Sequence, residues 1–382
     1  MIKFRRFIQV LFTFFMSVQC LKGQQTFHVS IQIPGSFAGK NFLVTYDNGL
    51  RIITVTDSFA NNKLNFSGIF YSKFAVLKIT HTSGDSISNS DEYFIGVKPA
   101  KIIFLENSDM STDGNFKHYE SKNAIEIHQS KINRQRIEFS KNEISDMIRF
   151  YGKNIDSIWR VDSLKTLFSK KLYDLDNKGL DFIKKHRNDY FSFWWFRTQI
   201  IPNTFRNENA SIIDFQNLLN FYNTVFSYSY KKSLEGKNIS KLLTGRIYTK
   251  KTHKAWDFKV KDIAGNLIKL NDFKGKYVLL DFWATWCGPC MQQLPFVKKI
   301  REDYPIDKLV MISISSDVNY NKFDSVIKKN KMNWIHIFGD DLLKIYGINA
   351  IPAIILIDKN GAIIYDGKNE DNDDLVRLLK MM

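Results

Sequence analysis

The stretch Val278-Leu279-Leu280-Asp281-Phe282-Trp283-Ala284-Thr285-Trp286-Cys287-Gly288-Pro289-Cys290 joins an apolar, strand-like run to a stretch that is compatible with a helix. Two cysteines at this spacing, at the start of a helix, can approach closely enough to form and break a disulfide. Unpaired backbone N–H groups and the helix dipole stabilise a thiolate on the first cysteine. Because a thiolate is the species that attacks disulfides, the junction predicts thiol–disulfide exchange.

The length and composition indicate several folded parts. A chain of 382 residues exceeds one ordinary domain, and 44% hydrophobic residues with 32 Phe can supply a core to each part. The net charge of +16 would permit binding to nucleic acid or an anionic surface. However, Lys and Arg are spread through amphipathic stretches. We therefore interpret them as solvated faces and expect no nucleic-acid partner.

The N-terminus has the pattern of a secretory signal peptide. An apolar stretch at residues 7–18 follows three basic residues, Lys3, Arg5 and Arg6. It is too short to be favoured as a membrane span. We expect residues 1–23 to be removed by cleavage after Gly23, and the protein to act in the periplasm or cell envelope.

Cys20 raises the alternative of a lipoprotein. Lipoprotein signals carry a small residue before the lipidated cysteine, whereas Gln19 is bulky. Lipid anchoring at Cys20 is therefore less favoured, as is an uncleaved anchor. Loss of Cys20 with the signal would leave Cys287 and Cys290 as the only cysteines.

This pair is poorly suited to a structural role. A bridge between residues three apart closes almost no loop, so it constrains the unfolded chain very little. A lone close pair in an exported protein of this size indicates redox chemistry. We expect no cofactor besides the redox-active disulfide Cys287–Cys290.

Residues 24–110 are predicted to form a small β-sandwich or barrel-like domain. Alternating runs at 27–33, 42–46 and 74–79 are separated by turn residues such as Pro34-Gly35. Several short strands at this spacing are typical of such folds. No catalytic constellation is visible in this region.

Residues 111–250 are predicted to be helical. Apolar residues recur three and four positions apart, and Asp and Asn occupy expected caps. The aromatic cluster at 191–196 is interpreted as helical core, with an aromatic ligand platform as the less favoured alternative. The polar, Lys-rich residues 244–254 are predicted to form a linker.

Residues 251–382 alternate between strand and helix patterns, which predicts an α/β sheet with parallel pairs. A hairpin is expected at 262–268, with Gly265-Asn266 at its turn. The following elements are expected in order: strand 277–283, helix 287–304, strand 309–315, helix 319–331, a short helix near 340–346, strand 353–358, strand 362–366 and helix 371–381.

These residues carry a family resemblance. The stretch 281–290 resembles the thioredoxin active site, and Ile351-Pro352 before the strand at Ala353 matches the cis-proline loop of that family. The extra helix and the leading hairpin resemble the exported TlpA/ResA-like branch. The whole layout is similar to exported oxidoreductases of Bacteroidetes type, which carry an N-terminal β domain. The resemblance implies a thioredoxin-like C-terminal domain; residues 24–250 match in layout only.

The resemblance implies roles for the cysteines and the facing proline. Cys287 would be the attacking thiolate, with a partly exposed sulfur, and Cys290 the resolving thiol that breaks the mixed disulfide. Pro352 in cis would remove a backbone donor beside the sulfurs and leave the backbone of Ile351 facing a substrate chain.

Four residues are implied to contact substrate: Trp286, Gly288, Pro289 and Ile351. Gly288 and Pro289 permit the tight turn, because Pro is tolerated in the first helical turn. Trp283 and Trp286 are both expected to pack beside the cysteine pair.

Asp281 lies in the middle of an apolar strand. A buried carboxylate there would have a raised pKa and could accept the proton of Cys290, as the buried acid of thioredoxin does. The alternative is an Asp at a strand end that is hydrated. TlpA/ResA-like proteins commonly carry a glutamate where this chain has Gln293, which cannot exchange a proton near neutrality. Proton transfer is therefore assigned to Asp281.

His336 lies in the strand-like run Trp334-Ile335-His336-Ile337-Phe338. It could join the cysteines as a copper ligand, but copper-delivery relatives use a CxxxC spacing. We expect a structural His and no metal site.

The favoured hypothesis is an exported dithiol–disulfide exchange enzyme. The Gly-Pro dipeptide resembles reducing thioredoxins, which favours a protein-disulfide reductase supplied by a membrane electron donor. Its partners would be exported thiol or disulfide proteins, including apocytochrome c, and a homodimer is possible. A peroxidase is less favoured, because Ala284 stands where a peroxiredoxin needs Thr or Ser. A partner-binding or scaffold protein with a vestigial thioredoxin domain is the third alternative.

Overall fold

The structure is a computed structural model of the 382-residue chain. It describes residues 24–35, 41–50, 52–55, 59–83, 86–90, 92–104, 115–116, 118–122, 124–126, 146, 149–154, 157–158, 160–207, 210–367 and 372–382. The predicted signal peptide at residues 1–23, with Cys20, lies outside the described residues. Across the described ranges, no helix has both the length and the apolar character needed to cross a membrane.

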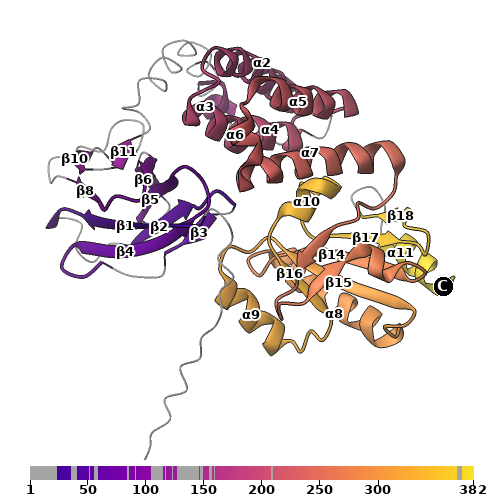
Figure 1. The fold of residues 1–382 in the computed structure, drawn as a ribbon. Coiled ribbons are helices and arrows are strands. Elements are labelled where there is room, and N and C mark those ends of the chain that lie inside the picture. The colour runs from indigo at the N-terminus through magenta and orange to yellow at the C-terminus, as the bar shows by residue number, and fades with distance from the viewer. Residues whose placement is uncertain are drawn as a thin grey trace, which may run out of the picture.

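The N-terminal part contains two β-sheets that share one core (Figure 1). The first has the order β10-β8-β1-β4, formed by His118–Lys122, Ala100–Phe104, Gln25–Gln32 and Lys63–Phe70. The second has the order β11-β7-β5-β2-β3, formed by Ala124–Glu126, Tyr93–Ile95, Ala75–Ser83, Asn41–Asp47 and Ile52–Thr54. Two strands lie off this path: β6 (Ser86–Ser90) pairs with β5, and β9 (Asn115–Phe116) pairs with β6. Phe27, Ile31, Leu77 and Ile102 are among the fully buried core residues, as the alternating pattern predicts.

Strands continue beyond residue 110, where we expected the helical part to begin. β10 pairs antiparallel with β8, and β11 pairs antiparallel with β7. These strands read His-Tyr-Glu-Ser-Lys and Ala-Ile-Glu, so they lack the apolar alternation by which a strand is recognised in a sequence. Backbone pairing to neighbouring strands defines them instead.

The middle part is helical, as predicted. Its elements are α2 (Asp162–Lys185), α3 (Tyr190–Trp195), the π-helical turn η2 (Phe196–Ile200), α4 (Ile201–Arg206), α5 (Ile212–Val225), α6 (Tyr228–Lys232) and α7 (Leu234–Thr252). All six residues of the aromatic cluster at 191–196 are buried. The prediction that this cluster is helical core is therefore confirmed.

The predicted linker at 244–254 is wrong, because most of it belongs to α7. Gly245 faces Ile345: a Cβ at this glycine would lie 3.1 Å from two Ile345 side-chain carbons. The Thr249 hydroxyl donates to the Ile345 carbonyl at 3.0 Å. The Lys-rich composition reflects the exposed side of a helix whose other side is buried, so composition alone suggested a linker.

The C-terminal part is an α/β domain with the predicted elements. A hairpin of β12 (Lys259–Lys261) and β13 (Leu267–Lys269) leads through the 3-10 turn η3 (Leu270–Phe273) into a five-stranded sheet with the order β16-β15-β14-β17-β18. The sheet strands are Ile335–Phe338, Leu309–Ser315, Tyr277–Trp283, Ala353–Ile357 and Ile363–Asp366 in that order. The helices are α8 (Gly288–Asp303), α9 (Tyr320–Lys329), α10 (Asp341–Tyr346) and α11 (Asn372–Lys380). β14 runs parallel to β15 and antiparallel to β17.

The sheet buries both faces. Along β14, Val278, Leu280 and Phe282 join a core that contains residues of α7 and α10. The alternate residue Leu279 packs with Val297 of α8 and Leu375 of α11. Since successive side chains of a strand point to opposite faces, α8 and α11 cover one face, and α7 and α10 cover the other.

One apolar core connects all three parts. It extends from Val76 and Phe94 of the β part, through Trp194, to Leu243 of α7 and Phe282 of β14. Figure 1 shows α7 running between the other helices and the α/β domain. The three parts therefore pack as one structure.

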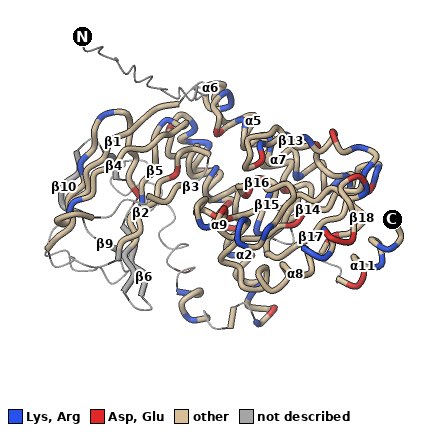
Figure 2. The backbone as a smooth tube through the Cα atoms, turned by 90° about the horizontal axis from the view of Figure 1, so that it is seen from below, with Lys and Arg blue, Asp and Glu red and all other residues tan. Residues whose placement is uncertain are grey.

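A buried charged cluster also joins the parts. Arg197 of η2 forms an ion pair with Asp47 of β2, and its Nε lies 3.1 Å from Glu235 Oε1 of α7. The second contact is an ion pair without hydrogen-bond geometry, since Arg197 Nε has no hydrogen-bond partner within the described residues. Tyr190 donates to Glu235 Oε1 at 2.9 Å. Elsewhere, Lys and Arg are distributed over the β, helical and α/β parts (Figure 2).

Candidate active site

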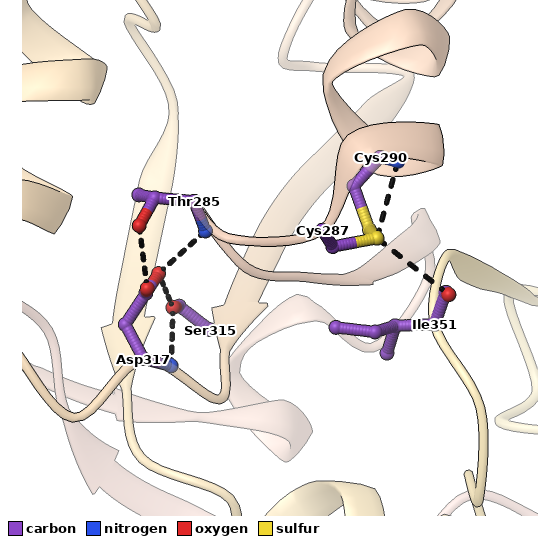
Figure 3. Close-up of a disulfide and its surroundings, with 6 residues drawn as sticks. All are labelled: Thr285, Cys287, Cys290, Ser315, Asp317 and Ile351. Atoms are coloured by element: carbon purple, nitrogen blue, oxygen red, sulfur yellow. Dashed lines mark hydrogen bonds between the residues drawn. A yellow bond between two sulfur atoms is a disulfide. The ribbon is translucent and has the colours of Figure 1, made fainter. Parts of the chain in front are cut away.

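The two cysteines form a disulfide at the start of α8 (Figure 3). The S–S distance is 2.02 Å and the Cα–Cα distance is 5.2 Å. Cys287 is the N-cap residue of α8, and its sulfur accepts the Cys290 backbone N–H at 3.2 Å. Such a position favours a negative charge on the sulfur, because it faces unpaired N–H groups and the positive end of the helix dipole.

Both cysteines are shielded in the disulfide form. Cys287 is 5% exposed and Cys290 is 4% exposed. The resemblance implied a partly exposed Cys287 sulfur, and the structure shows a more buried residue. Gly288 and Pro289, which separate the cysteines, are exposed. The surface above the cysteine pair that is accessible to solvent is therefore the first turn of α8.

A cis peptide bond joins Ile351 to Pro352, as the resemblance implied. The Ile351 carbonyl oxygen lies 3.6 Å from Cys287 Sγ. The loop follows α10 and precedes β17, which is the neighbour of β14 in the sheet. The structure thus brings together residues more than 60 positions apart in the sequence.

The loop before Cys287 is anchored by Asp317, a buried residue that the motifs in the sequence did not reveal (Figure 3). Its carboxylate accepts the Thr285 backbone N–H at 2.9 Å and the Thr285 hydroxyl at 2.6 Å. Ser315 donates to the same carboxylate at 2.6 Å. A signal was available, because Ser315 and Asp317 lie at the end of β15, whose carboxyl end lies beside that of the parallel strand β14.

The two tryptophans near the pair differ in their surroundings. Trp283 is 4% exposed and packs in one cluster with both cysteines. Trp286 is 61% exposed, so the expectation that both tryptophans pack beside the pair is wrong for Trp286. Trp286 lies beyond the end of β14, where no sheet face is available to bury its ring.

Asp281 is buried in β14, 4% exposed, and is not hydrated at a strand end. Burial raises its pKa from 3.8 to about 6, and the hydrogen bond from the Ser313 hydroxyl, 2.7 Å from Oδ2, opposes this rise. Asp281 lies on the same face of β14 as Leu279 and Trp283, which pack against α8. It therefore faces the helix that carries Cys290, where a carboxylate with this pKa can exchange a proton near neutrality. Gln293 of α8 is half-buried.

Asp281 belongs to a row of residues across the sheet. Ile354 of β17, Asp281, Ser313 of β15 and His336 of β16 are successive partners in register, so their side chains share one face. His336 is buried, and its Nε2 lies 3.0 Å from the Met332 carbonyl oxygen. Burial lowers the pKa of His336 to about 4, which keeps it neutral. Its Nδ1 is buried and has no hydrogen-bond partner among the described residues. The burial of the ring and the Met332 contact fit the structural role that we expected for His336.

The arrangement is suited to disulfide exchange. It places a disulfide-bonded cysteine pair at a helix start, a cis-proline loop against the first sulfur and a buried acid on the sheet face that α8 covers. A thiolate at the position of Cys287 would be stabilised by the helix, and the acid can take up a proton when a thiol reacts.

Comparison with known proteins also indicates thiol–disulfide exchange. A thioredoxin-like family model matches residues 275–363. The thiol-disulfide oxidoreductase ResA of Bacillus thuringiensis subsp. konkukian is 32% identical over 120 residues, a match covering 31% of this chain and 69% of that protein. The thioredoxin-like protein YneN of Bacillus subtilis is 35% identical over 120 residues, covering 28% and 65% respectively.

Among solved structures, the thioredoxin domain of a thiol-disulfide oxidoreductase from Bacteroides vulgatus is 31% identical, with a TM-score of 0.31, and the match covers 34% of this chain and 94% of that one. The ResA match extends over more than two thirds of that relative, and the residues matched by the family model include the cysteine pair. Through its C-terminal thioredoxin-like domain, the chain belongs to the ResA/TlpA-type thiol-disulfide oxidoreductases.

Proposed function

We propose that the protein is an exported protein-disulfide reductase that transfers electrons from the Cys287–Cys290 dithiol to disulfides in other exported proteins. The observation that carries the proposal is the cysteine pair at the start of α8, with the first sulfur against the cis Ile351-Pro352 loop. The proposed compartment rests on the signal-like N-terminal sequence.

The reaction consists of two exchange steps. The Cys287 thiolate attacks a substrate disulfide, forms a mixed disulfide and expels one substrate thiolate. Cys290 then loses its proton and attacks the Cys287 sulfur, which expels the second substrate thiolate. The substrate gains two electrons, and its two thiolates take up one proton that originates from Cys290 and one from water, while the enzyme pair is oxidised to the disulfide.

Asp281 is proposed as the group that accepts the Cys290 proton. Its burial on the sheet face covered by α8 and its pKa of about 6 suit this role. Gln293 stands where related enzymes commonly carry an acid, and an amide cannot take up the proton. The carboxylate in the sheet therefore takes over this role.

The exposed residues around the pair are proposed to contact substrate. Trp286, Gly288 and Pro289 are exposed beside Cys287, and the Ile351 carbonyl faces the sulfur. An apolar ring and the Ile351 backbone at one site suit an extended polypeptide segment. Candidate substrates are wrongly oxidised exported proteins or apocytochrome c.

Electrons would come from a membrane donor that takes them from the cytoplasm. The Gly-Pro dipeptide supports the reducing direction, because thioredoxin with this type of site has a potential of about −270 mV. Equilibration of the protein with glutathione measures this directly. A potential above about −180 mV would contradict the reductase proposal and favour an oxidase or isomerase.

Trapping of mixed disulfides tests the exchange chemistry and identifies partners. In Cys290→Ala, the resolving thiol is absent, so Cys287 should retain substrates as mixed disulfides that reducing agent releases. The double variant Cys287→Ser, Cys290→Ala is the matched control. Equal capture by both proteins would reject Cys287 as the attacking residue.

A further inference from the structure

We infer that Ser313 and Trp334 are positioning residues. Trp334 orients the Ser313 hydroxyl so that it donates a hydrogen bond to the Asp281 carboxylate. This bond favours the ionised carboxylate, which is the form that can accept the Cys290 proton. The inference rests on the proposed function, because it concerns the second exchange step. It assigns a role in proton transfer to two residues outside the motif and the loop.

The direction of the hydrogen bonds follows from the chemistry of the side chains. Trp334 Nε1 lies 2.8 Å from Ser313 Oγ, and an indole N–H can only donate. Ser313 therefore accepts from Trp334 and points its own proton at Asp281 Oδ2, 2.7 Å away. Ser313 is fully buried, so water cannot replace either partner. Trp334 thus fixes Ser313 as a donor to the carboxylate.

The other elements around Asp281 present few charges to it. The buried residues of α8, α9 and α11 on this face are Cys290, Leu294, Val297, Ile300, Phe323, Ile327, Leu375 and Leu379. The cross-strand neighbour on β17 is Ile354. The titratable groups on the same face are Cys287, Cys290, His336, Tyr277, Tyr304 and Tyr365, with Asp262 near His336 and Asp317 at the end of β15.

Of the described side chains around Asp281, Ser313 is the one that forms a hydrogen bond with the carboxylate. His336 donates through Nε2 to the Met332 carbonyl and is neutral, since burial lowers its pKa to about 4. Asp317 is bound by Thr285 and Ser315. The causes that shift the pKa of Asp281 are burial, which raises it, and the Ser313 hydrogen bond, which lowers it.

Loss of the Ser313 hydroxyl should therefore shift the pH dependence of the second step. The bond stabilises the ionised carboxylate, so Ser313→Ala raises the pKa of Asp281. The rate of Cys290 attack follows the ionised fraction of Asp281, so it falls as the pH is lowered. The pH midpoint of this acidic limb should be higher in Ser313→Ala than in the wild type by roughly one pH unit or more. Trp334→Phe frees the hydroxyl to rotate, so it should move the limb in the same direction by a smaller amount.

The reagent DTNB separates the two steps in a stopped-flow experiment. Attack by Cys287 on DTNB releases the first coloured thiolate, and attack by Cys290 on the mixed disulfide releases the second. Ser313→Ala should shift the pH midpoint of the second phase and leave that of the first unchanged. Ser313→Thr, which keeps a hydroxyl, should restore the wild-type midpoint.

Matched controls come from the helical part. Ser192 and Trp194 are buried, and their side-chain polar atoms, Ser192 Oγ and Trp194 Nε1, have no hydrogen-bond partner within the described residues. Ser192→Ala and Trp194→Phe therefore make the same chemical changes far from the site in sequence. Neither should move either midpoint.

The outcomes separate the inference from the proposed function. A wild-type protein without a second phase would overturn both. A normal wild type whose midpoint does not move in Ser313→Ala and Trp334→Phe would overturn the inference alone. The inference is also overturned if Ser313→Ala slows both phases equally at every pH, or if its shift persists in an Asp281→Asn background.

Discussion

Replacement of Asp281 by Asn should stabilise the α/β domain at high pH and not at low pH. The cause is the burial of a carboxyl group in β14, which raises its pKa from 3.8 to about 6. The folded state then binds a proton more tightly than the unfolded state does. Ionisation therefore costs stability once the pH exceeds the unfolded value.

The size of the effect follows from the two pKa values. At about 1.4 kcal/mol per pH unit, a rise from 3.8 to about 6 corresponds to about 3 kcal/mol. The cost is absent below about pH 4, grows between about pH 4 and 6, and is complete above about pH 6. An Asn amide that lacks a partner adds a penalty, but this penalty is the same at every pH. The gain at about pH 8 should therefore exceed the gain at about pH 4 by about 3 kcal/mol.

Hydrogen exchange of the β14 and β15 amides provides the assay, because it reports the opening of this sheet within the intact chain. The oxidised wild type and Asp281→Asn are compared at two pH values, after correction for the intrinsic exchange rate. Asp303→Asn on the exposed end of α8 is the control for loss of one charge. A gain that is equal at both pH values would refute the argument that a buried ionised carboxylate lowers stability here.

Three further predictions concern other contacts. Glu235→Gln should raise the thermal midpoint at about pH 8 but not below about pH 4.5, because burial raises the pKa of Glu235 from 4.5 to about 7; a midpoint gain that does not vary with pH would contradict this. Thr285→Val should cost about 1 kcal/mol in urea unfolding, because it removes one hydrogen bond to Asp317; unchanged stability would mean that Asp317 does not anchor this loop. Gly245→Val should cost about 1–3 kcal/mol by crowding Ile345, and a scanning-calorimetry trace like that of the wild type would show that α7 and α10 can separate at no cost.

The α/β domain could be predicted from the sequence because its strands are apolar and its helices are amphipathic. The expected ranges of β14 and β15 agree with the structure residue for residue. The cysteine pair and the Ile351-Pro352 loop could also be found, because local motifs carry them. Burial of Asp281 followed from its place within an apolar strand.

The missed features depend on contacts between distant residues. β10 and β11 are polar strands that exist through pairing with β8 and β7. Ser313 and Asp317 acquire their roles only when β15 is placed beside β14, and neither has a motif of its own. The helical nature of 244–252 depends on burial against α10, which composition does not reveal.

Helix α7 has a consequence for how the protein can be divided. Leu242, Leu243 and Gly245 are buried, and Thr249 bonds to the last turn of α10, just before the cis-proline loop. A fragment cut at the start of the thioredoxin-like sequence would keep α10 but lose the cover that α7 gives to the same side of the sheet. A fragment that begins at Ser233, the N-cap of α7, would retain that cover together with the redox pair. By this criterion, a fragment that keeps the α7 cover of the sheet is longer than residues 275–363, the region that the thioredoxin-like family model matches.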